Sequence, residues 1–374
     1  MRYLIPALAR RGYPVDLIKV RKHGPNLDAI PSGVRVIDSG VSSTVLALPA
    51  LVRYLRQHRP AVLLCDKDKV NRIALLARWL SGSRQTRLVL SMGTTISIEL
   101  KNRGWLDRSI QRFSMGYLYR LADQVIVTCN DVADDMSEYT GLPRERIISV
   151  ESPVIPAELF EHRPPCPEHP WFADGGPPII LGVGELSVRK NFAMLIRAFA
   201  TLRQHQPCRL IIVGRGKKLE ELKSLAAELG VSEAVDFPGF RSDVYAYMAH
   251  ASAFAMSSRW EGLGFVLIEA MAAGTPVASA RCPSGPREIL QDGRLGPLVD
   301  VDDAPALAKA LAQILAKPLP AEALQQGARP YEIEAATDAY LRAFALPPRF
   351  QTETTANPQP PSRSSVHAED LLGG

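Results

Sequence analysis

Apolar and polar positions alternate in blocks along the first part of the chain. Segments with helical spacing at 3–11, 46–58, 71–80 and 132–140 alternate with short apolar runs at 15–20, 61–65, 87–91 and 125–129. Short apolar runs between helical segments are typical of buried strands. Strands that alternate with helices predict a parallel α/β sheet. Asn130 and Asp131 are the predicted caps of the helix at 132–140.

A stretch rich in proline and glycine, residues 162–178, interrupts this alternation and has neither a helical nor a strand period. Beyond it, strands are predicted at 179–183, 209–213, 235–237, 253–257 and 276–280, with helices at 192–204, 219–229 and 266–273. We therefore expect an N-terminal α/β domain over 1–161, a linker over 162–178 and a C-terminal domain over 179–331. Residues 347–374 are rich in Pro, Ser and Thr and are predicted to be a disordered tail.

Composition narrows the class of protein. A chain of 374 residues with 46% hydrophobic and 22% charged residues fits two globular domains. The net charge of +5 is spread along the chain, which disfavours dedicated nucleic-acid binding. The five cysteines have no metal-ligand spacing, and the sequence shows neither a long apolar run nor a signal peptide. We expect a cytoplasmic protein without a metal site.

The strongest chemical signal lies at 261–277. Two carboxylates, Glu261 and Glu269, have seven residues between them, the first in a glycine-containing loop and the second in the following helix. Gly262 and Gly264 allow close backbone approach, and the N-terminus of the following helix attracts anions. A nucleotide sugar needs such donors for its diphosphate and acceptors for its hydroxyls. The alternative is a glutamate in a surface turn and a solvated helix residue, but the apolar run around Glu269 argues against it.

A second signal follows the predicted strand at 179–183, where a glycine turn at Gly184 and two cations, Arg189 and Lys190, precede a helix. These cations could neutralise a diphosphate leaving group. The alternative is a solvated basic helix start, although cations there oppose the helix dipole. A dinucleotide fingerprint is incomplete because Ser187 stands at its third glycine, so a dehydrogenase fits poorly.

These segments, with 210–216, 235–239 and 274–277, resemble the retaining GT-B glycosyltransferases of family 4 from about Ala122 to the helix before Pro347. The resemblance implies two Rossmann-like domains with parallel sheets that face each other across a cleft. It also implies that the helix at 332–346 crosses back to the N-terminal domain. The segment 282–288 resembles the loop after the family's two-carboxylate helix, and equally fits a Pro/Gly turn.

By position, the resemblance implies that Arg189 and Lys190 bind the diphosphate, that Glu269 holds the ribose and that Glu261 meets the transferred sugar. The remaining donor-binding positions are Gly184, Gly262, Gly264 and Phe265. Such enzymes use front-face chemistry without a covalent nucleophile, metal or cofactor. The implied partners are a UDP or GDP sugar and a carbohydrate or lipid-linked acceptor, in the synthesis of cell-surface polysaccharide or glycolipid.

The sequence departs from the family at three places. Glu185 stands where arginine is frequent, and 91–95 lacks a histidine. The chain also begins inside the first helix, so we expect a central strand position to be empty, through a misplaced start codon or a truncated gene. The rival predictions are a catalytically impaired glycosyltransferase-like protein and a GT-B sugar-nucleotide epimerase.

The segment 103–120 combines aromatic residues with arginines at helical spacing. It could dock peripherally on anionic lipid at the inner face of the plasma membrane. The favoured alternative is an amphipathic helix packed on the first domain with solvated arginines.

Overall fold

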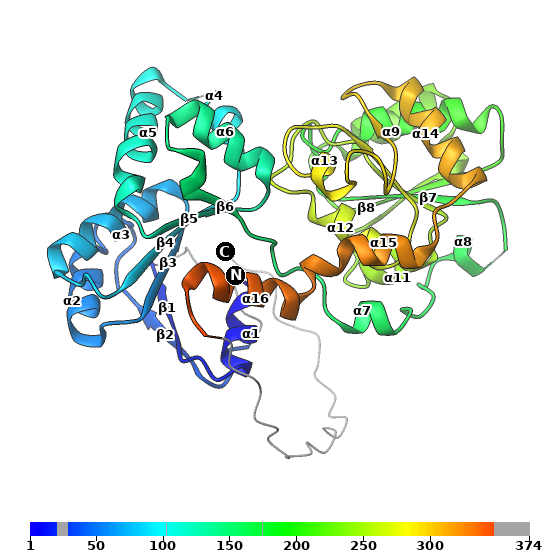
Figure 1. Cartoon of the computed structure of the whole chain (residues 1–374). Coiled ribbons are helices and arrows are strands. Elements are labelled where there is room, and N and C mark those ends of the chain that lie inside the picture. The colour runs from blue at the N-terminus through cyan, green and yellow to red at the C-terminus, as the bar shows by residue number, and fades with distance from the viewer. Residues whose placement is uncertain (21–28, 102, 174, 348–374) are drawn as a thin grey trace, which may run out of the picture.

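The computed structural model describes residues 1–20, 29–101, 103–173 and 175–347. The described chain forms two α/β lobes, N-terminal and C-terminal, which stand side by side (Figure 1). The N-terminal lobe contains α1 (Leu4–Arg10), β1 (Val15–Lys19), β2 (Val34–Asp38), α2 (Leu48–His58), β3 (Val62–Asp66), α3 (Asp68–Ser81), β4 (Arg87–Met92), α4 (Ile96–Lys101), α5 (Trp105–Tyr117), β5 (Gln124–Val127), α6 (Asn130–Thr140) and β6 (Ile147–Ser149).

Parallel strands build the N-terminal lobe, as the alternating pattern predicts. Strands β3, β4, β5 and β6 pair in that order, while β1 and β2 form a separate parallel pair. Apolar side chains from the two sheets, including Ile18 of β1 and Leu63 of β3, pack in one cluster. Among the described residues no strand bridges β1 and β3. The empty central strand position itself stays a prediction.

The C-terminal lobe is a six-stranded parallel sheet of order β12-β11-β10-β7-β8-β9. Ile180 and Ile212 point into one core and Leu181 and Ile211 into the other, as the two-residue strand repeat requires. Its elements are β7 (Ile179–Val183), α9 (Phe192–Arg203), β8 (Arg209–Val213), α10 (Leu219–Glu228), β9 (Val235–Gly239), α11 (Val244–His250), β10 (Ala253–Met256), α12 (Phe265–Ala272), β11 (Val277–Ala280), α13 (Pro286–Ile289), β12 (Leu298–Val299), α14 (Ala304–Ala316) and α15 (Ala321–Ala328). Helices therefore cover both faces of a doubly wound sheet.

The segment between the lobes is more ordered than its proline and glycine content predicts. The short helix α7 (Glu158–Glu161) precedes it, and α8 (Pro170–Ala173) lies within it. Nε2 of His169 lies 2.9 Å from Oδ2 of Asp236, which fastens this segment to the C-terminal lobe.

The last helix, α16 (Ile333–Phe344), lies beside α1 of the N-terminal lobe (Figure 1). Arg11 of α1's C-cap donates to Oε2 of Glu334 at 2.9 Å and also pairs with Asp338. Tyr340 and Phe344 share a core with Leu4 and with the sheet. The predicted disordered tail lies, apart from Pro347, outside the described residues.

Helix α5 packs on the N-terminal lobe, as the favoured interpretation of the segment 103–120 expects, but it does not turn its aromatic residues inward. The residues that it buries are Gln111, Ser114, Met115 and Gly116, whereas its aromatic residues are exposed. Oγ of Ser114 donates to Oδ1 of Asp68 at 2.9 Å, and this carboxylate also accepts from Oη of Tyr119 at 3.0 Å. A buried polar network thus holds the polar face inward, because Asp68 needs those donors.

Candidate active site

The two predicted cations and the first predicted carboxylate meet in one cluster. Nη1 of Arg189 lies 2.7 Å from Oε2 of Glu261, and Nζ of Lys190 lies 2.7 Å from Oε1. Oγ of Ser258 donates to the same Oε1 at 2.7 Å. Lys190 and Glu261 are both 8% exposed, so the cluster is largely shielded from water. It carries two positive charges and one negative charge.

Backbone geometry after β7 explains why Lys190 reaches this position. Gly184 has φ +151°, and a Cβ there would lie 2.8 Å from Cε of Lys190. Glycine therefore leaves the path along which the lysine stem runs. Asn191 adopts φ +51° before α9, and its Nδ2 donates to Oδ1 of Asp302 at 2.8 Å. Arg259 also pairs with Asp302, at 2.9 Å, which fixes the turn from a second side.

The loop that carries Glu261 is pressed against the N-terminal lobe. A Cβ on Gly262 would lie 2.6 Å from the backbone oxygen of Gly93, just after β4. Gly264 has φ +94° and begins α12 without a side-chain cap. Phe265 follows at the first turn of the helix and is 46% exposed. The N-terminus of α12 thus opens close to the contact between the lobes.

Glu269 occupies a different environment from Glu261. It is half-buried in α12, and this burial raises its pKa from 4.5 to about 7, although the charge of Lys190 acts in the opposite direction. Burial also raises the pKa of the neighbouring Tyr245, with the Glu269 charge as a second cause. The charge of Lys190 acts on Glu269, but the expected polar contact of this carboxylate stays a prediction. The Glu269 carboxyl is therefore poised to change its protonation near neutral pH.

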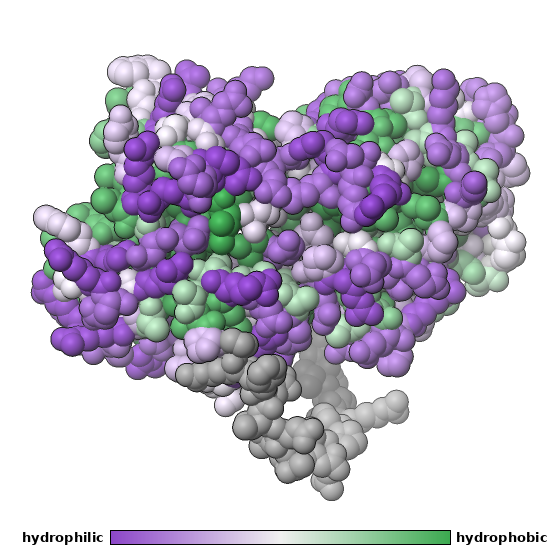
Figure 2. All heavy atoms as spheres, viewed as in Figure 1, coloured by the Kyte–Doolittle hydropathy of each residue, from purple (hydrophilic) through white to green (hydrophobic). Residues whose placement is uncertain are grey.

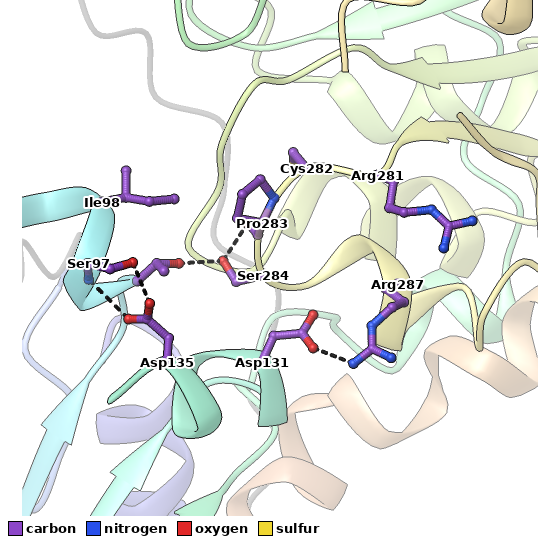
Figure 3. A pocket seen from close by; sticks show the side chains of 10 residues that line it. Ser97, Ile98, Asp131, Asp135, Arg281, Cys282, Pro283, Ser284 and Arg287 are labelled. Carbon is purple, nitrogen blue, oxygen red and sulfur yellow. Dashed lines mark hydrogen bonds and ion pairs between the residues drawn. The ribbon is translucent and has the colours of Figure 1, made fainter. Parts of the chain in front are cut away.

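A cavity of about 400 Å³ lies between the lobes next to this cluster (Figure 3). Oγ1 of Thr95 donates to Oγ of Ser284 at 2.9 Å, and Ser284 donates to the backbone oxygen of Glu261 at 2.7 Å. One hydrogen-bonded chain therefore joins the cavity wall to the Glu261 loop. The cavity is lined by Thr95, Ser97, Ile98, Asp131, Asp135, Arg281, Cys282, Pro283, Ser284 and Arg287.

Charged residues of the segment 282–288 close the far side of the cavity. Nη2 of Arg287 lies 2.6 Å from Oδ1 of Asp131. The Glu288 carboxylate accepts from the backbone nitrogen of Asn130 at 2.7 Å and from its Nδ2 at 3.1 Å. Burial raises the pKa of Glu288. The prediction that Asn130 and Asp131 cap α6 is therefore wrong, because no side chain of that segment caps the helix. The Glu288 carboxylate of the other lobe accepts from its first turn instead.

The sequence analysis did not identify the N-terminal residues of this cavity as site residues. The segment that ends at Thr95 was noted only for its missing histidine, Ser97 was not named, and Asp131 was expected only as a cap. Within the described ranges, no group of three or more His, Cys, Asp or Glu side chains is placed to hold a metal ion. No described helix is both long and apolar enough to cross a bilayer.

Comparison with known proteins shows that both lobes are similar to glycosyltransferases. Residues 1–151 match the glycosyl transferase 4-like domain, and residues 169–330 match the family of glycosyl transferases group 1. The chain therefore resembles these glycosyltransferases in both of its lobes. Its fold is GT-B, since it superposes on a glycosyltransferase from Rickettsia africae with a TM-score of 0.76, at 16% identity over 91% of this chain and 92% of the other. Anabaena HepE in complex with UDP gives a TM-score of 0.71, at 17% identity over 88% of this chain and 99% of the other.

Two curated glycosyltransferases are similar in sequence. The lipopolysaccharide core biosynthesis glycosyltransferase LpsE of Rhizobium meliloti is 38% identical over 46% of this chain and 51% of its own length. The N-acetylgalactosamine-N,N'-diacetylbacillosaminyl-diphospho-undecaprenol 4-alpha-N-acetylgalactosaminyltransferase of Campylobacter jejuni is 31% identical over 66% of this chain and 65% of its own length. The chain thus spans between about half and two thirds of these relatives.

Proposed function

We propose that this glycosyltransferase moves a sugar from a nucleoside-diphosphate sugar to an acceptor hydroxyl with retention of anomeric configuration. The observation that carries the proposal is the buried cluster in which Arg189 and Lys190 share one carboxylate, Glu261, beside the N-terminus of α12. Its excess positive charge suits a diphosphate. The similarity to glycosyltransferases that build lipopolysaccharide core and act on a diphospho-undecaprenol acceptor supports a role in cell-surface polysaccharide or glycolipid synthesis.

The cluster suggests how the donor binds. The diphosphate binds the two cations in place of Glu261, so the Glu261 carboxylate can accept hydrogen bonds from hydroxyls of the transferred sugar. Gly184, Gly262, Gly264 and Phe265 bring backbone groups to the phosphates, and Glu269 accepts from the ribose hydroxyls. HepE, of the same fold, binds UDP, which supports a nucleotide donor of the UDP or GDP type.

The acceptor occupies the cavity between the lobes in this proposal. Asp131 and Asp135 of α6 line it and can accept hydrogen bonds from sugar hydroxyls. The acceptor oxygen bonds to the anomeric carbon on the face from which the diphosphate leaves, and its proton passes to the departing phosphate oxygen. Arg189 and Lys190, rather than a metal ion, neutralise the charge on the leaving group.

Two measurements test this function. A thermal melt with UDP, GDP and their sugars identifies the base, because a ligand of the folded state raises the melting temperature. Product analysis with the stabilising sugar nucleotide and a carbohydrate or lipid-linked acceptor then separates transfer from epimerisation. If neither nucleotide raised the melting temperature at millimolar concentration, that result would contradict the donor-site assignment. Binding without turnover would instead favour the catalytically impaired alternative.

A further inference from the structure

One apolar surface of the N-terminal lobe has no role in the donor site or the cavity. Leu106, Ile110, Phe113, Tyr117 and Leu121 recur at the spacing of a single helical stripe along α5 and the turn η1 (Leu118–Leu121) that follows it. These five side chains are between 44% and 67% exposed, and the adjacent Trp105 is 72% exposed. We refer to these six residues as the α5 stripe. An exposed apolar patch of contiguous residues marks an interaction site.

The α5 stripe is held outward by specific contacts. The Ser114–Asp68–Tyr119 network fixes the polar face of α5 on the lobe. Rotating the helix to bury the stripe would take the Ser114 and Tyr119 hydroxyls away from the buried Asp68 carboxylate, and the loss of these hydrogen bonds opposes that rotation. The exposure of the stripe is therefore built into the fold.

The charges around the stripe indicate what covers it. Between 99 and 121 the chain has five cations and two carboxylates, and one carboxylate, Glu99, pairs with Arg103 at 2.9 Å. Arg120 stacks over the ring of Tyr117 at 5.6 Å, so a cation lies directly beside the apolar side chains. The five cations are Lys101, Arg103, Arg108, Arg112 and Arg120. Apolar side chains flanked by arginine and lysine match acyl chains beneath anionic headgroups.

The shape of this surface also favours a membrane over a second copy of the chain. The stripe lies on a helix at the outer edge of the N-terminal lobe, where Figure 2 shows hydrophobic surface at the rim rather than in a hollow. A two-fold dimer through α5 would set the same five cations against one another. We propose that α5 lies on anionic lipid, with the α5 stripe inserted at the level of the headgroups and the arginines on the phosphates.

This inference goes beyond the proposed transfer reaction, because lipid binding requires no turnover. It has one consequence for that reaction. Helix α6 packs against α5 and also lines the cavity between the lobes. Docking through α5 therefore brings the cavity close to the lipid surface, where a lipid-linked acceptor is presented.

The experiment is cosedimentation of the full chain with vesicles of phosphatidylcholine alone and of phosphatidylcholine and phosphatidylglycerol in equal parts. We expect binding to the anionic vesicles only, with a decrease as salt is added. The variant Leu106→Gln/Leu121→Gln should reduce the partition coefficient about tenfold or more. The matched control is Leu46→Gln/Leu319→Gln, which alters two leucines that are 61% and 39% exposed outside α5. It should bind as the wild type does.

Separate experiments test the role of the cations and the depth to which the α5 stripe enters the lipid. Arg108→Glu should weaken binding to anionic vesicles severalfold, whereas Lys309→Glu in α14 should not. Tryptophan fluorescence of the wild type should be quenched by brominated lipid, and less so in Trp105→Phe. No binding to anionic vesicles at low salt overturns the proposal. So does binding that the stripe variant leaves unchanged, or a stripe-dependent dimer in light scattering without vesicle binding.

Discussion

The raised pKa of Glu269 leads to a prediction about stability that needs no substrate. Replacing the carboxylate in Glu269→Gln keeps the shape of the side chain and removes its charge. A pKa shift from 4.5 to about 7 corresponds to about 3 kcal/mol between the two protonation states. The folded protein binds this proton more tightly than the unfolded chain. The contribution of this bound proton to the free energy of unfolding is therefore complete below about pH 4.5 and is lost as the pH rises through about 7.

Thermal or urea unfolding of the ligand-free protein between pH 5 and pH 8.5 measures this effect. We expect the variant and the wild type to be similar at pH 5, and the variant to be more stable at pH 8 by up to about 3 kcal/mol. The control is Glu228→Gln, because Glu228 is an exposed glutamate at the end of α10 and its replacement should leave the profile unchanged.

The same variant should bind UDP or GDP less tightly, by about tenfold or more, because a charged acceptor for the ribose hydroxyls is lost. A gain in stability together with a loss of nucleotide affinity is the signature of a carboxylate kept for binding. Parallel pH profiles for the wild type and Glu269→Gln would refute the burial argument. Unchanged nucleotide affinity would refute the ribose assignment alone.

Four further variants test the geometry of the site. Lys190→Ala and Arg189→Ala should each lower the transfer rate by about 10²-fold or more in a steady-state assay, because each removes a charged donor to the leaving diphosphate. Near-normal turnover in both variants would mean that the two cations have a structural role only. Gly285→Ala should lower the melting temperature strongly, because φ is +93° and a Cβ would lie 1.8 Å from the backbone oxygen of Leu263. Gly230→Ala, at φ +69° with open space around the Cβ, should lower the free energy of unfolding by only about 1–2 kcal/mol. Equal destabilisation by Gly285→Ala and Gly230→Ala would contradict the close approach at Gly285.

The parts of the fold that could be predicted are those encoded by local runs of sequence. Five of the six strands of the C-terminal sheet, all except the two-residue β12, were predicted as short runs between helical segments, so their parallel pairing followed from the pattern. The cluster of Arg189, Lys190 and Glu261 was accessible because its two motifs are specific in composition and spacing. Chemistry that lies at the ends of parallel strands converges in space even when it is distant in sequence.

Contacts between the lobes could not be predicted in this way. Thr95 meets Ser284, and Asp131 meets Arg287, across more than 150 residues of chain. No local pattern records the placement of one lobe on the other. Helix α5 shows a related limit: the period of 3.6 residues revealed its apolar stripe, but not that Asp68 would hold the opposite face to the protein.

The two glutamates of the 261–269 motif show why spacing alone does not assign roles. Glu261 lies between two cations at 2.7 Å and accepts from Ser258, so its carboxylate is a charge partner in a closed network. Glu269 is eight positions further along, where burial dominates its electrostatics and its pKa rises to about 7. A ligand's diphosphate can replace Glu261 as the partner of the two cations, whereas the buried Glu269 carboxylate gains from hydrogen-bond donors that stabilise its charged form. We therefore propose that the first carboxylate exchanges ion pairs when the donor binds and that the second binds hydroxyls.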